Sequence, residues 1–502
     1  MLLAKTKLSI LVVGVWAALA VGCSGGGQMD PAAVKRLAVM PFEDATAQKD
    51  FGDLADGVTF RLTSALGTAK NLDVIASSSA MEYKLRPRTL ADVQKTLGVD
   101  ALMEGDVNIV GESVTINAWL RDAKTDKRVW ETKASGKREA TFVVVEQVAE
   151  SLSQWLKRPL HIKKTEAAPS WQHFLFLLES QKLTKRTDPV DVNLAVYDLE
   201  KVRGDYPDFW PARAPQAELF GRLVALEFLT RDKAREWVKG ILYDTRQQEP
   251  DSAEAYYAEG ALKYYVDWDY AAAETALKKA IEIRPNLVYA WHALAQLYIT
   301  TNRLPLALET IEKAQELDPL GYETTRERAS ILASNGRWDD SLKAIADAGT
   351  LTKEEQAISI LRGLFQFGKG DTEAARVSIA ALVSGTQELV AVQALYGAVQ
   401  AKLGKPEETR RMLGLFDSRA KKKLPAADPI HYALLHLSLG DTAKGFSELE
   451  AAVAAHRTLA LGLPGNPAFT AYRSDPRYQA VIAKVAGAKP IVPAGSTPSA
   501  NQ

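Results

Sequence analysis

The sequence predicts two architectures in one chain, an α/β N-terminal domain followed by an all-α solenoid of helix pairs. In the first third, short apolar runs alternate with amphipathic stretches and with segments of period two, the pattern of mixed helices and strands. Further on, Pro285 and Pro319 are 34 residues apart within long helical periodicity, a spacing typical of stacked helical repeats. With 47% hydrophobic and 25% charged residues among 502, the composition suffices for two or three globular units.

The N-terminus predicts export and a lipid anchor. Lys5 and Lys7 precede an apolar run that is too short to cross a bilayer comfortably, and the run ends at Ala20, Gly22 and Cys23, the only cysteine. This arrangement resembles the lipobox of bacterial lipoproteins, in which the cysteine thiol receives a diacylglyceryl group and the cysteine becomes the mature N-terminus. An ordinary secretory signal that happens to contain a cysteine is the alternative. Several acyl chains, at about 0.8 kcal/mol per buried CH₂, would hold the chain at a membrane.

The residues after Cys23 indicate the membrane to which such a lipoprotein is sorted. Ser24, in place of an aspartate, resembles lipoproteins that are sorted onward to the outer membrane. We therefore expect a cell-envelope protein that is lipid-anchored, in the outer membrane, and faces the periplasm. Gly25, Gly26 and Gly27 predict a flexible tether. Export permits disulfides, but the mature chain has no second thiol to form one, so its core must supply the stability.

Periodicity and caps predict the elements of the α/β domain in order. Leu54, Val58, Leu62 and Leu66 recur every four residues, as on one face of a helix. Two later segments alternate apolar and polar residues on either side of a Gly-Glu turn, which predicts a hairpin with one buried face. The expected order is strand, helix, strand, helix, three strands and a helix, over about 36–44, 51–67, 72–77, 89–98, 103–109, 114–120, 129–136 and 140–157.

This order resembles the TolB amino-terminal-like domain over about 36–157. The resemblance is carried by the segments LAVMPFED, ADGVTFRLTSAL, VIASSSAMEYK and LGVDALMEGDVNIVGESVTINAWLRDAKTDKRVW. It implies a binding or regulatory module and no catalysis. Such modules often precede tetratricopeptide arrays in bacterial signalling and envelope proteins. Those architectures usually carry an effector domain N-terminal to the module, whereas this chain has the expected lipid anchor at that position.

The helical region resembles a tetratricopeptide (TPR) array. One unit fits the pattern W-x₂-L-G-x₂-Y, A-x₃-F, P, and the preceding unit repeats it at the same offsets. Small residues let the two helices of a repeat approach closely, and proline ends the second helix. We expect about seven or eight repeats from about 170 to 455 and a closing helix that begins at Asp475 and Pro476. The two best units are Tyr257, Ala261, Tyr264, Ala273, Leu277, Ala280 and Pro285, then Trp291, Leu294, Ala295, Tyr298, Ala307, Ile311, Ala314 and Pro319.

These boundaries divide the chain into six segments. Between the two periodic regions lies a stretch with Pro159, several lysines and small residues, the composition of an exposed boundary. The expected segments are a lipoprotein signal peptide at 1–22, a flexible tether at 23–34, the TolB-like domain at 35–158, a linker at 159–170, the TPR-type repeat domain at 171–485 and a disordered tail at 486–502.

The sequence lacks the common motifs for catalysis, cofactors and metals. It has no P-loop, no dinucleotide fingerprint, no H-E-x-x-H and no nucleophile elbow, so we expect neither an enzyme nor a bound cofactor. His431 and His436 fall on different sides of a helix, and no metal site is expected there. Asp267 and Asp269 lack the rest of a calcium loop and are interpreted as solvated turn carboxylates. Basic and acidic residues balance at 62 each, which gives no electrostatic reason for nucleic-acid binding.

The concave face of a helical solenoid is built mainly from the first helix of each pair and commonly binds a peptide. We predict Tyr265, Tyr289, His292, Gln296 and Arg326 as the partner-binding residues on this face. Tyrosine supplies buried area, whereas glutamine and arginine can hydrogen-bond a main chain or a carboxylate. The alternative for Tyr265 and Tyr289 is that they simply pack the inner face.

These features together predict a non-enzymatic adaptor or scaffold lipoprotein at a bacterial membrane. It would bind protein or peptide partners through the solenoid and the TolB-like domain, and reach the membrane through its lipid anchor. Two alternatives stay open. One is a ligand-sensing envelope protein, whose first domain binds a small molecule. The other is a glycan-acting envelope enzyme with paired carboxylates between repeats.

The first testable prediction concerns the anchor. In Cys23→Ser the chain should keep its leader and lose all acyl mass, because no other thiol exists to be modified. Intact-mass spectrometry of parent and variant from the same membranes measures both effects. Acyl chains that persist on the variant would disprove lipidation at Cys23, and recovery of the parent only with inner-membrane vesicles would disprove the outer-membrane assignment.

Overall fold

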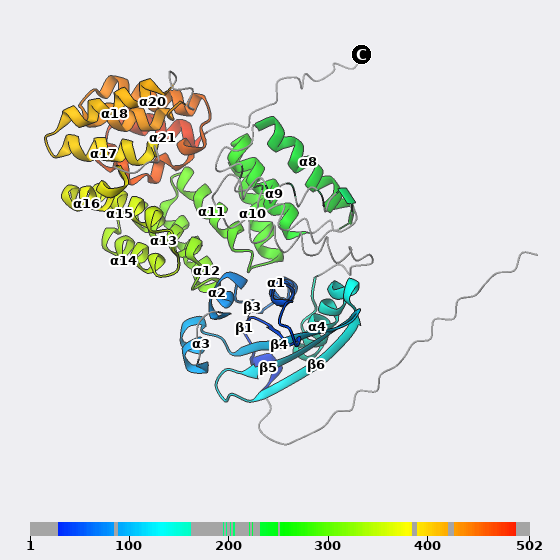
Figure 1. The fold of residues 1–502 in the computed structure, drawn as a ribbon. Helices are drawn as coiled ribbons and strands as arrows, with labels where there is room; N and C mark the ends of the chain where they lie inside the picture. The colour runs from blue at the N-terminus through cyan, green and yellow to red at the C-terminus, as the bar shows by residue number, and fades with distance from the viewer. Residues whose placement is uncertain are drawn as a thin grey trace, which may run out of the picture.

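The protein is described from a computed structural model, drawn as a ribbon in Figure 1. Cys23, the expected signal peptide and nearly all of the expected tail lie outside the described residues, as do most of the linker and most of 171–230. The described ranges are 29–84, 89–161, 231–248, 252–383, 389–419 and 426–487, with single residues between 194 and 223. Among these, no helix combines the length and the apolar character needed to cross a bilayer.

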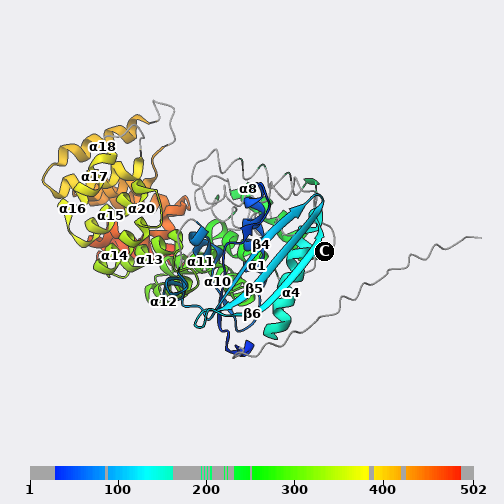
Figure 2. The ribbon, with the colours of Figure 1, turned by 60° about the horizontal axis from the view of Figure 1, so that its bottom comes forward.

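The first domain is a mixed six-stranded sheet with helices on both faces (Figure 2). The strand order is β3-β1-β4-β5-β6, and β2 also pairs with β4. β1 runs parallel to β3 and β4, whereas β4, β5 and β6 form an antiparallel meander. The strands are β1 (Arg36–Val39), β2 (Glu43–Asp44), β3 (Asp73–Val74), β4 (Ala101–Val110), β5 (Ser113–Asp122) and β6 (Arg128–Lys137).

Alternation along β1 divides the core of this domain between the two faces of the sheet. Leu37 and Val39 lie in the larger apolar cluster with α1 (Gly52–Leu66) and α4 (Thr141–Leu156). Ala38 lies in the smaller cluster on the other face, with Val93 and Leu97 of α3 (Leu90–Leu97). The predicted α/β fold is confirmed, and α3 has the predicted ends. Thr89 Oγ1 accepts the Asp92 amide at 3.1 Å, and Gly98 has the left-handed φ of +62° that glycine tolerates.

The predicted strand over 72–77 is too long. β3 ends at Val74, although the amide of Ile75 still donates to the carbonyl of Leu37 in β1 at 2.8 Å. The chain then begins α2 (Ser77–Met81), which a 3₁₀ turn at Glu82–Lys84 follows. The reason is a contact made far away in the sequence, because the amide of Ala76 donates to the carbonyl of Leu317 at 2.8 Å. The partner of this residue is therefore the helical region and not a neighbouring strand.

The helical region stacks antiparallel helix pairs, as predicted, into a curved solenoid (Figure 1). Ala273, Ala280, Ala307 and Ala314 are fully buried where paired helices meet. A side chain at Gly260 would bring its Cβ within 2.7 Å of Leu277, so close packing requires glycine there. The helices are α8 (Arg231–Gln248), α9 (Ala253–Ala261), α10 (Tyr270–Ile283), α11 (Val288–Thr300), α12 (Leu304–Leu317), α13 (Tyr322–Ser334), α14 (Trp338–Gly349), α15 (Glu355–Lys369), α16 (Thr372–Val383), α17 (Val390–Lys402), α18 (Pro406–Ser418), α19 (Pro429–Ser438), α20 (Thr442–Ala454) and α21 (Pro476–Ala486).

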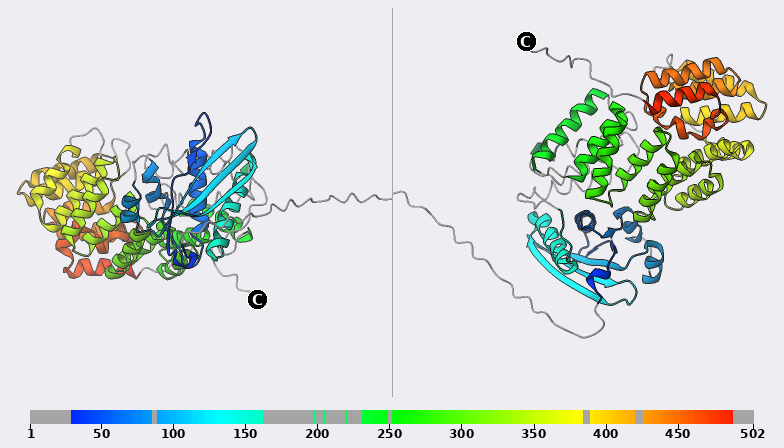
Figure 3. Two further views of the ribbon diagram at one scale, coloured as in Figure 1. Left: turned by 90° about the horizontal axis from the view of Figure 1, so that it is seen from below. Right: turned by 180° about the vertical axis from the view of Figure 1, so that it is seen from behind.

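An unpredicted segment follows the last helix pair. Two 3₁₀ helices, η6 (Thr458–Gly465) and η7 (Pro467–Tyr472), cross from α20 to the first helices of earlier pairs, and we call 458–472 the strap. Thr300 Oγ1 of α11 donates to the carbonyl of Leu461 at 2.7 Å. The strap thereby joins α11 and α13 to the C-terminal helices, which Figure 3 shows from two further sides. The predicted closing helix, α21, begins at Pro476 with Asp475 as its cap.

The α/β domain rests on two consecutive turns of the solenoid. At the turn after α10, Arg284 Nη1 donates to Ser64 Oγ at 2.7 Å, and Asn286 Nδ2 donates to the carbonyl of Thr63 at 3.1 Å. At the turn after α12, a carboxylate oxygen of Asp318 accepts hydrogen bonds from two serine hydroxyls at the start of α2. Figure 1 shows α1 and α2 directly against the lower edge of the helical region.

Buried ion pairs flank the first of these contacts, one within each domain. Arg284 pairs with Glu254 of α9 at 2.5 Å, and Arg61 of α1 pairs with Glu146 of α4 at 3.0 Å, all four side chains being nearly buried. Burial alone would raise the pKa of Glu254. The opposing charge of Arg284, with help from Ser252 and Arg61, lowers it below its ordinary value instead. Glu254 is therefore ionised at neutral pH and depends on Arg284.

The second prediction tests that dependence. Arg284→Ala should lower the free energy of unfolding by about 3–5 kcal/mol, because the change leaves a buried carboxylate without its partner. Lys279→Ala is the matched control, since its ion pair with Glu282 is exposed, and it should cost less than about 0.5 kcal/mol. Urea unfolding of both variants measures the difference. Equal losses would show that the buried pair stabilises the folded chain no more than the exposed pair does.

Candidate partner-binding surface

The structure brings four of the five predicted residues onto neighbouring first helices of the solenoid. Tyr289, His292 and Gln296 lie on α11, and Arg326 lies on α13. All four side chains are half-buried. Tyr265 also lies nearby, but in a π-helical turn (Leu262–Asp267) that continues α9, not in the regular helix that was expected. We call the surface formed by these five residues the inner surface.

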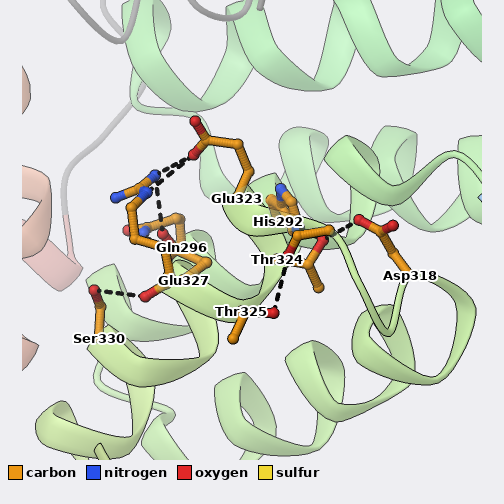
Figure 4. A network of polar contacts seen from close by, with 10 residues as sticks. His292, Gln296, Asp318, Glu323, Thr324, Thr325, Glu327 and Ser330 are labelled. Carbon is orange, nitrogen blue, oxygen red and sulfur yellow. Dashed lines mark hydrogen bonds and ion pairs between the residues drawn. The ribbon is translucent and has the colours of Figure 1, made fainter. Parts of the chain in front are cut away.

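His292 is hydrogen-bonded to the neighbouring repeat (Figure 4). Its Nε2 lies 3.0 Å from Thr324 Oγ1, and this hydroxyl donates to Asp318 Oδ2 at 2.6 Å. Burial lowers the pKa of His292 to about 4, although the charges of Asp318 and Glu323 act in the opposite direction. The imidazole is therefore neutral at pH 7. Because the Thr324 hydroxyl donates to Asp318, His292 Nε2–H donates to Thr324, and Nδ1 is the acceptor of the ring.

Arg326 is held between two carboxylates. Its Nε and Nη2 both donate to Glu323 Oε2, at 2.9 and 2.8 Å, and Nη2 lies 4.0 Å from Glu327 Oε2. The other carboxylate oxygen of Glu327 accepts the side-chain amide of Gln296. Burial raises the pKa of Glu327, and the charge of Arg326 opposes this shift. The inner surface thus contains one guanidinium, two carboxyl groups and an amide within a single contact network (Figure 4).

The two tyrosines pack against other rings, as the alternative in the sequence analysis allowed. Tyr289 meets Tyr257 edge to face, with ring centroids 4.8 Å apart, and Tyr265 lies 4.5 Å from the ring of Tyr264. Burial, and then the charge of Glu327, raise the pKa of Tyr265. Both rings remain half-buried and not fully enclosed, so each combines a packing role with some accessible area.

Comparison with known proteins identifies the type of repeat. Residues 268–322 match the family described as tetratricopeptide repeat. The helical region is a solenoid of tetratricopeptide-like helix pairs, and the family match itself covers 268–322. The chain is also 28% identical over 134 residues to a putative adenylate cyclase 3 of Rhizobium meliloti (strain 1021), a match that covers 27% of this chain and only 23% of that protein.

Two solved structures are similar to parts of the chain. One is the APC/C hetero-tetramer Cut9–Hcn1, at 14% identity with a TM-score of 0.42, covering 62% of this chain and 55% of that one. The other is a tetratricopeptide repeat protein of Parabacteroides merdae, at 16% identity with a TM-score of 0.37, covering 53% of this chain and 99% of that one. Neither likeness bears on what the present chain binds.

Several polar residues that complete the inner surface of the solenoid were not predicted. Thr324 and Glu327 lie on the same helix as Arg326, and Asp318 lies in the turn before it. Glu327 directly follows Arg326 in the sequence, and it was not among the residues predicted for this surface. Only its burial beside Gln296 and Arg326 reveals its part in the network.

The interpretation of Asp267 as a solvated carboxylate was wrong. This side chain is buried and pairs with Arg235 at 3.1 Å and with Lys263 at 2.9 Å. Asp269 instead accepts the amide of Ala272 at 3.2 Å and caps α10. Within the described ranges, no group of three or more histidine, cysteine, aspartate or glutamate side chains is arranged to hold a metal ion.

The third prediction concerns His292. Because its pKa is about 4 in the folded chain and about 6.5 when unfolded, the unfolded chain binds more protons between these values. This part of the stability should therefore be complete above about pH 6.5 and decline as the pH falls toward 4. His292→Gln should remove that part of the decline, and the exposed His161→Gln serves as the control. Urea unfolding at several pH values measures the effect, and an NMR titration midpoint near 6.5 for His292 would contradict it.

Proposed function

We propose that this chain is a lipid-anchored adaptor of the bacterial cell envelope. It would sit in the outer membrane, face the periplasm, and hold protein partners through the tetratricopeptide solenoid and the TolB-like domain. The observation that carries the proposal is the inner surface, where half-buried hydrogen-bonding groups lie beside accessible aromatic rings. The lipid anchor rests on the lipobox-like sequence that ends at Cys23.

The inner surface has the mixed chemistry that recognises a peptide. The Arg326 side chain is 32% exposed and that of Glu323 is 49% exposed, so both can exchange their mutual contact for one with a partner. His292 adds a neutral ring, and Tyr289 adds an aromatic face. Arginine and tyrosine are the residue types that most often dominate protein interfaces. A peptide with both polar and apolar groups suits this combination.

Alanine is a poor test of Arg326, because its charge partly offsets the buried carboxyl group of Glu327. Arg326→Lys keeps the positive charge but loses the planar, two-pronged donor. Tyr289→Phe keeps the ring that packs on Tyr257 but loses the hydroxyl. Both variants should therefore fold like the parent, while the hydrogen-bonding groups offered to a partner change.

The fourth prediction uses these two changes together. Partners are captured on the lipidated parent in detergent-solubilised membranes and identified, and the affinity of each is then measured with purified chains. The double variant Tyr289→Phe, Arg326→Lys should bind a true solenoid partner about tenfold or more weakly, since hydrogen bonds to charged groups contribute about 1.5–3 kcal/mol.

The matched control is Lys313→Arg on α12, whose contact with Glu316 lies on an exposed outer helix. It should leave the affinity unchanged. If the double variant melts like the parent and binds every partner with parental affinity, the inner surface is not the binding site. Binding that survives there but is lost on deletion of 35–158 would assign the partner to the TolB-like domain.

A further inference from the structure

A continuous line of hydrogen bonds runs from the inner surface to the contact with the α/β domain. It begins at His292, passes through the hydroxyl of Thr324, and reaches the carboxylate of Asp318. The other oxygen of this carboxylate accepts hydrogen bonds from Ser78 Oγ at 2.5 Å and Ser79 Oγ at 2.6 Å. One buried carboxylate therefore serves both the inner surface and the domain contact.

We propose that occupancy of the inner surface is coupled to the docking of the α/β domain through His292, Thr324 and Asp318. The proposal rests on the proposed function for the occupant, since it concerns regulation of the same surface. A ligand that engages or displaces His292 changes the hydrogen bond to Thr324. It thereby changes how firmly Asp318 holds the start of α2.

Asp318 has little freedom to absorb such a change locally. Its side chain is buried, with 3% of the residue exposed. The neighbouring Gly321 leaves the room that the carboxylate occupies, because a Cβ at that position would lie only 1.7 Å from Asp318 Oδ2. The aspartate therefore has little room to adjust by itself. A shift of the Thr324 hydroxyl changes the hydrogen bonds that the Asp318 carboxylate accepts from the two serines.

The docking contact around Asp318 is polar enough to be shifted by one hydrogen bond. The Ala76 amide donates to the Leu317 carbonyl at 2.8 Å, and the Leu320 amide donates to Ser79 Oγ at 2.8 Å. The apolar contribution comes from Leu320, which packs against the smaller core cluster of the α/β domain. Single hydrogen bonds of this kind change an equilibrium by a few-fold to about tenfold.

The turn after α10 keeps the domains together when the contact at Asp318, in the turn after α12, loosens. Arg284 and Asn286 hold the end of α1 independently of Asp318, so a weakened Asp318 contact releases α2 without separating the chain into two parts. The two states that the inner surface biases are thus α2 docked and α2 released. Thermodynamic linkage makes this coupling reciprocal. The factor by which the occupant shifts the docking equilibrium equals the factor by which docking changes the affinity for the occupant.

The test places a surrogate occupant on the inner surface, so no partner needs to be known. In the full chain, Cys23→Ser removes the only native thiol and Gln296→Cys introduces one beside His292. Benzyl methanethiosulfonate then attaches a benzyl group, and a reductant removes it. Hydrogen exchange at the amides of Ala76 and Leu320 reads the docking contact directly, because both amides donate across it.

We expect the benzyl group to change exchange at both amides by at least about threefold, and the reductant to reverse the change. Adding Thr324→Val should abolish the response, because it removes the hydroxyl that joins His292 to Asp318. Thr325→Val is the matched control, because the Thr325 hydroxyl bonds within the solenoid, donating to the carbonyl of Gly321 and accepting from the side chain of Gln315. It should leave the response intact. Where labelling is incomplete, Gln296→Trp compared with Gln296→Ala supplies the same bulk genetically.

Unchanged exchange at Ala76 and Leu320 in fully labelled chains, or with Gln296→Trp, would overturn the proposal. A response that persists with Thr324→Val would overturn it as well, because the signal would then travel by another route. Either result leaves the proposed function standing, since partner affinity is not measured. Conversely, a partner that ignores Tyr289 and Arg326 would overturn the proposed function while the coupling could still be observed.

Discussion

The arrangement of the two domains depends on the 34-residue period of the solenoid. The period places Arg284 and Asp318 at equivalent positions in consecutive turns, each directly before a proline and on the same edge. Their charges are opposite, and each faces the end of an α/β-domain helix that suits it. The cation lies near the C-terminal end of α1, and the anion lies at the start of α2, as helix dipoles favour. The repeated backbone geometry thus places two contacts with the α/β domain, of opposite charge, one repeat apart.

Local signals in the sequence were sufficient for much of the fold. The period, the small buried residues and the cap at Thr89 predicted the repeats and most of the α/β domain, because these features depend on contacts within a few dozen residues. The start of α2, the strap and the buried pairing of Asp267 were missed or misinterpreted. Each of them depends on side chains brought together by folding, with Ser78 and Asp318 separated by 240 residues.

The inner surface illustrates the same division. Helical register placed Tyr289, His292, Gln296 and Arg326 on one surface, but it gave no information about how their polar groups are paired. The structure shows that Arg326 and Gln296 already bind Glu327, and that His292 binds Thr324. A ligand must therefore displace hydrogen bonds that already exist within the chain, which favours selectivity of binding over affinity.

The strap alters the mechanics of the solenoid. In an ordinary repeat array each unit contacts only its neighbours, so the array is stabilised by contacts between adjacent units alone. Here Thr300 of α11 donates to Leu461 of the strap, and Arg473, directly after the strap, donates to the carbonyl of Ser334 at the end of α13. A displacement of the C-terminal helices is consequently resisted by their contacts with α11 and α13. The curvature of the solenoid is thus held by contacts between distant repeats as well as between adjacent ones.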